Sequence, residues 1–228
     1  ECSNGTSGAY HTIFSFPAGE STVWCYLRGM NSHGQVFGTF GGIGGVWTPT
    51  VANGASGTLN ADLRFGSIAS YGPAGQTAGW NGTSNTFFEF FTPIGPNAVT
   101  GGFSTFELVY LTQSSLGRFG PGGELPFMNC FPPGARGSDC TWRPRIWRPL
   151  QAGTLAGSIE ELPVLEGFSA FYPEYLNARG EVLGTMQTPN RRDVPLLVSN
   201  GKMYDLGAIP GLPAIRSIGF NDAGQILL

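Results

Sequence analysis

The alternation of apolar and polar residues predicts short β-strands along this chain. LNADLRFG at 59–66 alternates apolar and polar side chains, as a strand with one buried face does. The β-prone run GGVWTPT at 44–50 precedes it and ends in a proline, which is tolerated at strand ends. SIASYG at 67–72 and QTAGW at 76–80 follow. The pattern therefore predicts four short strands in local succession within about 41 residues.

A short phrase recurs and predicts equivalent turns. Its copies are NSHGQVFG at 31–38, GPAGQTAG at 72–79, QSSLGRFG at 113–120, NARGEVLG at 177–184 and NDAGQILL at 221–228. In N-x-x-G the asparagine starts a tight turn, and the glycine supplies the positive φ that closes it. We interpret the phrase as a hairpin turn rather than a phosphate cradle, because no helical pattern follows the glycines.

The repeat predicts a single all-β domain over 1–228. Four antiparallel strands in each unit of 40-odd residues are typical of β-propeller blades, so five units predict a five-bladed propeller. The alternatives are a β-sandwich and an open β-repeat array. The predicted units are residues 1–43, 44–85, 86–120, 145–189 and 190–228, with an insert at 121–144. Trp47, Phe91 and Trp147 each stand two residues before a proline, and we expect them to end the first strand of their units.

Three arrangements would close the ring. The first unit lacks the aromatic-x-Pro strand, and the sequence stops directly after the last return strand. The segment around Cys2 fills the gap and is tied down by Cys25, or a neighbouring subunit donates a strand, or the natural chain continues past Leu228.

The repeated phrase resembles the HAF-family extracellular repeat of bacteria. The matching residues are 30–38 (MNSHGQVFG), 176–184 (LNARGEVLG) and 220–227 (FNDAGQIL), and MYDLG at 203–207 is also similar to such repeats. The resemblance implies a secreted or cell-surface propeller-like protein. It implies no catalytic residues.

Composition narrows the classes of partner. The net charge of −3 argues against nucleic-acid binding, which needs a basic surface. No apolar run approaches the roughly 20 residues of a membrane span. Lys202 is the only lysine, and lysines often protect sheet edges, so we expect edges to be hidden by closure or self-association. A start at Glu1 suggests a processed mature form, secreted or at the cell surface.

The cysteines and sequons fit the same compartment. The four cysteines lack CxxC spacing, and we expect two disulfides, Cys130–Cys140 and Cys2–Cys25; four reduced thiols in a cytoplasm are the alternative. Two histidines are too few for a usual zinc site, so no metal or cofactor is expected. Asn4 and Asn81 stand in N-x-T sequons and are candidate glycan acceptors.

The insert supplies the candidate ligand site. Trp142, together with Arg136, Arg143 and Arg145, could stack on a sugar or clamp a carboxylate. The alternative is that Arg143, Arg145 and Arg148 alternate along the solvent face of an edge strand, while Trp147 packs between blades.

No catalytic motif is present, and we expect a protein that is not an enzyme. Asp62, Glu89 and Glu107 lie on successive predicted strands and could converge, but the pattern favours outward positions. We therefore expect a structural or assembly module of an extracellular polymer or filament, with itself or other surface proteins as partners. A carbohydrate-binding, lectin-like propeller is the alternative, and a glycan-cleaving enzyme is a weaker one.

Overall fold

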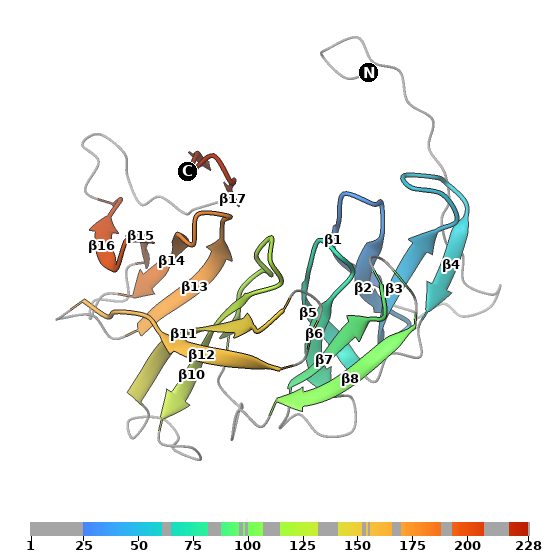
Figure 1. The fold of residues 1–228 in the computed structure, drawn as a ribbon, viewed down its shortest axis with the longest axis horizontal. Coiled ribbons are helices and arrows are strands. Elements are labelled where there is room, and N and C mark those ends of the chain that lie inside the picture. Colours follow the sequence, from blue (N-terminus) through green and yellow to red (C-terminus); the bar gives the residue numbers. More distant parts are fainter. Residues whose placement is uncertain are drawn as a thin grey trace, which may run out of the picture.

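The computed structural model is all-β, and strands are the only regular elements among the residues that it describes. These residues are 25–60, 65–81, 88–95, 98, 100–106, 115–131, 141–151, 154, 156–165, 170–187, 193–207 and 219–227. Four four-stranded antiparallel sheets follow one another along an arc in chain order (Figure 1). The prediction of a β-propeller-like repeat is thereby confirmed.

Each sheet is a meander in which every strand pairs with the next one along the chain. The first contains β1 (Cys25–Met30), β2 (Val36–Phe40), β3 (Ile43–Pro49) and β4 (Gly57–Asn60). The second contains β5 (Phe65–Tyr71), β6 (Thr77–Asn81), β7 (Phe88–Pro93) and β8 (Gly101–Phe106). The third contains β9 (Ser115–Leu116), β10 (Leu125–Phe131), β11 (Thr141–Pro149) and β12 (Gly157–Glu161). The fourth contains β13 (Ala170–Leu176), β14 (Val182–Gln187), β15 (Asp193–Ser199) and β16 (Lys202–Asp205).

The number of blades differs from the prediction. Four blades are complete, and the fifth sheet has only two described strands, β17 (Gly219–Phe220) and β18 (Ile226–Leu227). This hairpin contacts β13 (Figure 1). Residues 1–24 lie outside the described part of the chain, so the three explanations for ring closure stay predictions, except that Cys25, which is a free thiol, does not tie the first segment down.

The predicted units also begin at the wrong strand of each blade. Trp47, Phe91 and Trp147 lie near the ends of β3, β7 and β11, which are third strands and not first ones. The chain leaves each blade from its fourth strand and enters the next blade at its first strand. A repeat in sequence fixes the period of the blades but not the strand at which each blade begins.

The repeated phrase forms the same turn between the first and second strands of a blade. Asn31 donates its backbone N–H to the Gln35 carbonyl, and Gly34 donates to the Asn31 carbonyl. The Asn31 Oδ1 accepts from the backbone N–H groups of His33 and Gln35, at 3.1 Å each. Asn177 makes the equivalent contacts, and Asn221 makes those to Gly224 and Gln225. The predicted hairpin turn is confirmed at these copies.

One copy of the phrase was placed wrongly. The third copy is not QSSLGRFG but GPGGE at 120–124, where Gly120 donates to the Glu124 carbonyl and Gly123 donates to the Gly120 carbonyl. Gly123 has φ +86°, and the fourth-position glycine has a positive φ in every copy. The described residues 121–131 of the predicted insert are therefore part of a regular blade: they contain this turn and β10, a buried strand up to Phe131.

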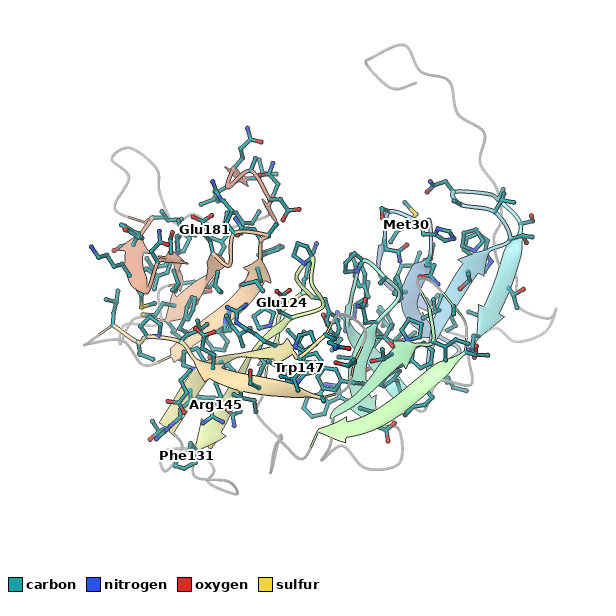
Figure 2. The ribbon with its side chains drawn as sticks, viewed as in Figure 1. Met30, Glu124, Phe131, Arg145, Trp147 and Glu181 are labelled. Atoms are coloured by element: carbon teal, nitrogen blue, oxygen red, sulfur yellow. The ribbon has the colours of Figure 1, made fainter. Side chains whose placement is uncertain are left out.

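The turns gather along one edge of the arc. Met30, which precedes the first turn, lies at the same edge as Glu124 and Glu181, whereas Phe131 lies at the opposite edge (Figure 2). Neighbouring turns touch: the Asn31 Nδ2 donates to the Pro73 carbonyl at 3.3 Å, and the Ala178 N–H donates to the Asp222 carboxylate at 2.8 Å. The repeat therefore joins blades as well as strands.

Apolar clusters fill the spaces between consecutive sheets. Phe91 packs towards the first sheet with Phe37 and Phe65, whereas its neighbour Phe90 packs towards the third sheet. The centroids of the Phe90 and Trp147 rings lie 5.4 Å apart. This follows from alternation along a strand, which sends successive side chains to opposite faces. The contact between Phe90 and Trp147 confirms the expected packing of Trp147 between blades.

Candidate functional site

The predicted arginine cluster lies on β11, and its charges are neutralised within the sheet. Arg143 and Arg145 donate to one oxygen of Glu161, at 3.0 and 2.7 Å. Their hydrogen bonds, that of Arg145 first, lower the pKa of Glu161. Arg148 donates to Glu160 at 2.8 Å. A ligand carboxylate would have to displace Glu161 from this cluster.

Two further features of the cluster differ from expectation. β11 pairs with both β10 and β12, so it is a central strand and not an edge strand. Trp142 is half-buried opposite Cys130, and Arg143 lies 4.1 Å from the centroid of the Phe131 ring. Arg136 lies outside the described residues. Ligand binding by Trp142 and the arginines stays a prediction.

The predicted Cys2–Cys25 disulfide is wrong in this structure, because Cys25 is a free and exposed thiol at the start of β1. Cys2 lies outside the described residues. Cys130 is buried near the end of β10 and is in the disulfide form. Cys140 is not among the described residues, so the Cys130–Cys140 pairing stays a prediction.

The candidate glycan acceptors and catalytic acids are only partly described. Asn81 is the last residue of β6, and Asn4 lies outside the described part. Glu89 was expected to point outward, but it is 5% exposed, because both faces of β7 are covered by neighbouring sheets. Asp62 and Glu107 lie outside the described part, so the relation of the three acids to one another is not tested.

A pocket of about 230 Å³ lies where the first strands of the four blades meet. Its polar and aromatic lining comes from all four: Arg28 from β1, Ser70 and Tyr71 from β5, Arg118 just after β9, and Glu174 and Tyr175 from β13. First strands of propeller blades surround the central axis, and we call this site the axial pocket.

Contacts within and between blades hold this lining in place. The Arg118 N–H donates to the Glu174 carbonyl at 2.7 Å, and its guanidinium lies 5.0 Å from the centroid of the Tyr175 ring. The Tyr71 ring stacks on Phe37, with centroids 4.8 Å apart. The Glu174 Oε1 accepts from the Thr185 hydroxyl at 2.9 Å. The pocket is therefore largely formed without a ligand.

The charges of the axial pocket are unbalanced. Arg28 and Arg118 are exposed, and neither guanidinium has a carboxylate partner within salt-bridge distance in the described structure, unlike Arg143, Arg145, Arg148 and Arg179. Ser70 is 1% exposed, and its hydroxyl has no hydrogen-bond partner. Two cations beside one carboxylate, Glu174, leave an excess positive charge where a polar ligand would lie.

Sequence reasoning missed this pocket although a signal was present. Arg28, Ser70, Arg118 and Glu174 all stand two or three residues before the first residue of a repeat copy, at Asn31, Gly72, Gly120 and Asn177. Once the repeat is known to follow the first strand of each blade, residues at this offset are predicted to meet near the axis. The wrong phase and the misplaced third copy concealed this relation.

Other classes of site find no support in the described ranges. They contain no group of three histidine, cysteine, aspartate or glutamate side chains that could hold a metal ion. They also contain no helix that is long and apolar enough to cross a membrane. No family model matches the chain, and no curated protein is significantly similar to it. The axial pocket is thus the site on which a function can be argued.

Proposed function

We propose that this protein is a non-catalytic binding module that holds a small polar ligand in its axial pocket. The observation that carries the proposal is the convergence of four first strands, which brings two arginines without carboxylate partners into one preformed pocket. Ligand sites commonly combine a preformed cavity with a few convergent polar groups. Hydroxyl, guanidinium and aromatic groups together favour a carbohydrate, as in the lectin-like alternative from the sequence.

The proposed location is outside the cell or on its surface. The disulfide form of Cys130 is typical of oxidising compartments. The resemblance of the repeat to HAF-family extracellular repeats supports the same location.

Amide chemical shifts would test pocket binding directly. Glucose, galactose, glucuronate and galacturonate are titrated into ¹⁵N-labelled protein. We expect at least one of them to shift the amide signals of Ser70, Leu116 and Arg118 to saturation, while signals from β12 stay unchanged. The proposal fails if none of the four sugars moves the pocket signals.

A second candidate is the structural or assembly role. β1 exposes Tyr26, Leu27 and Met30 to 60%, 61% and 61%, and the fifth sheet has only two described strands. Exposed apolar rows of this kind favour association with another surface, here a second copy of the chain.

Light scattering coupled to size-exclusion chromatography tests this second role. Wild-type protein is expected to elute as an oligomer, and the triple substitution Tyr26→Ser, Leu27→Ser and Met30→Ser is expected to return it to a monomer. Ile94→Ser, on a residue 80% exposed in the second blade, is the control. A monomeric wild type at all concentrations contradicts the role.

A further inference from the structure

We infer that the ligand of the axial pocket carries a single carboxylate beside hydroxyl groups, as a sugar acid does, and that Arg28 and Arg118 hold the carboxylate. This inference rests on the proposed binding function and adds the chemical class of the ligand. It follows from the two arginines without carboxylate partners, from the polar and aromatic lining and from the size of the pocket.

The charge argument starts from the two guanidinium groups. Arginine presents a rigid fork of N–H donors that matches a carboxylate, and elsewhere in this chain arginines already make such pairs: Arg145 with Glu161 and Arg148 with Glu160. Arg28 and Arg118 are left without a carboxylate partner in the described structure. The described lining residues hold these two arginines and one carboxylate, Glu174, so their formal charges sum to about +1, which suits a monoanion better than a dianionic phosphate.

Two further polar side chains, Glu174 and Ser70, belong to the lining. The Glu174 Oε1 accepts from the Thr185 hydroxyl at 2.9 Å, and this bond restrains the carboxylate. The Ser70 hydroxyl is buried without a partner, and leaving such a group unsatisfied costs free energy. A polyhydroxylated acid therefore suits this polar lining better than a simple fatty acid does.

The size of the pocket limits the ligand to one sugar unit or a smaller acid. Its volume of about 230 Å³ is below the roughly 300–1,000 Å³ of sites for drug-sized ligands. The Tyr71 and Tyr175 rings, fixed by Phe37 and by Arg118, provide apolar surface against which the carbon skeleton can lie.

Titration calorimetry with glucuronate, glucose and inorganic phosphate tests the inference. We expect glucuronate to bind at least about tenfold more tightly than glucose or phosphate, since a hydrogen bond to a charged group contributes a factor of this order. Arg28→Gln and Arg118→Gln are each expected to weaken glucuronate binding about tenfold or more. Arg148→Gln is the matched control, because it removes the same group from a half-buried position outside the pocket, and it should bind like wild type.

The outcomes distinguish failure of the carboxylate inference from failure of ligand binding in the pocket. Glucose binding as tightly as glucuronate, or wild-type affinity in Arg118→Gln, overturns the carboxylate inference while pocket binding stands. Tighter binding of phosphate than of glucuronate overturns it as well. If neither sugar binds and the pocket amides do not respond to any of the four sugars, both the inference and the proposed function fail.

Discussion

The fifth residue of the repeat explains how two versions of the phrase make one turn. In two of the N-x-x-G copies the asparagine Oδ1 accepts the N–H of the third residue: Asn31 from His33 at 3.1 Å and Asn177 from Arg179 at 3.0 Å. In the G-P-x-G copies the asparagine is missing, and the side chain of the fifth residue replaces it: Gln76 Oε1 accepts from the Ala74 N–H, and Glu124 Oε2 from the Gly122 N–H. The same backbone donor is satisfied in both versions.

Substitution of the asparagine at the first position of the repeated phrase should destabilise the protein more where that asparagine is more buried. Asn177 is 3% exposed and accepts two backbone N–H bonds, so Asn177→Ala should lower the free energy of unfolding by about 1–3 kcal/mol. Asn221 accepts from Gln225 in the same way but is exposed, so water can replace its side chain in Asn221→Ala. Urea unfolding measures both variants, and equal losses would contradict the role of burial.

The carboxylate of Glu181 gives the fourth turn a pH dependence. The hydrogen bond from Asn177, with those from Ser199 and Arg179, lowers the pKa of Glu181 in the folded protein. A lowered pKa adds stability above the unfolded pKa of about 4.3, and this stability is lost as the pH falls through the folded value. Gln35 and Gln225 occupy the equivalent position and keep the asparagine contact, so Glu181→Gln should fold normally at pH 7.

The measurement is the thermal midpoint of wild type and Glu181→Gln between pH 7 and pH 3. We expect the wild type to lose more stability than the variant below about pH 4, since only the wild type must protonate this group. Parallel curves for the two proteins would show that Glu181 does not contribute to acid sensitivity.

At the scale of the strand, β7 shows how one element joins three blades. Phe91 faces the first sheet and Phe90 faces the third, so the strand is apolar on both sides. Its sequence, FEFFTP, therefore lacks the simple alternation that identifies a half-buried strand. This is also why Glu89 was expected to be exposed: an outward face was assumed for a strand that has none.

Truncation at the blade interface should cost more than truncation at its rim. Phe90→Ala leaves a cavity beside Trp147 and Phe119, and should lower the free energy of unfolding by about 3–5 kcal/mol. Phe131 is 37% exposed at the end of β10, so Phe131→Ala should cost much less (Figure 2). Chemical denaturation compares them, and a similar loss in both variants would contradict the packing of the second blade against the third.

At the scale of the whole molecule, the sequence predicts the fold class and the length of the repeat, but not the strand at which each blade begins. The turn residues and strand lengths are local, so the all-β repeat and the Asn31, Asn177 and Asn221 turns could be predicted. The strand that opens each blade depends on contacts between sheets, such as Arg118 with Glu174, and no local pattern encodes these. The axial pocket was missed for this reason, since its residues are assembled from four blades.

The same assembly explains why the sequence pointed to Arg143 and Arg145 and not to Arg28 and Arg118. Arg143 and Arg145 are prominent in the sequence, but antiparallel pairing of β11 with β12 brings Glu161 opposite Arg145, and both arginines pair with this carboxylate. Arg28 and Arg118 are isolated in the sequence and become neighbours only when the blades surround an axis.

A double-mutant cycle on Arg28 and Arg118, measured by titration calorimetry with glucuronate, tests the central claim most directly. If arginines from two blades hold one carboxylate, each single substitution to glutamine weakens binding, and the double variant departs from the sum of the single effects by more than about 0.5 kcal/mol. Wild-type affinity in either single variant, or effects that add within that margin, would contradict a shared site at the axis.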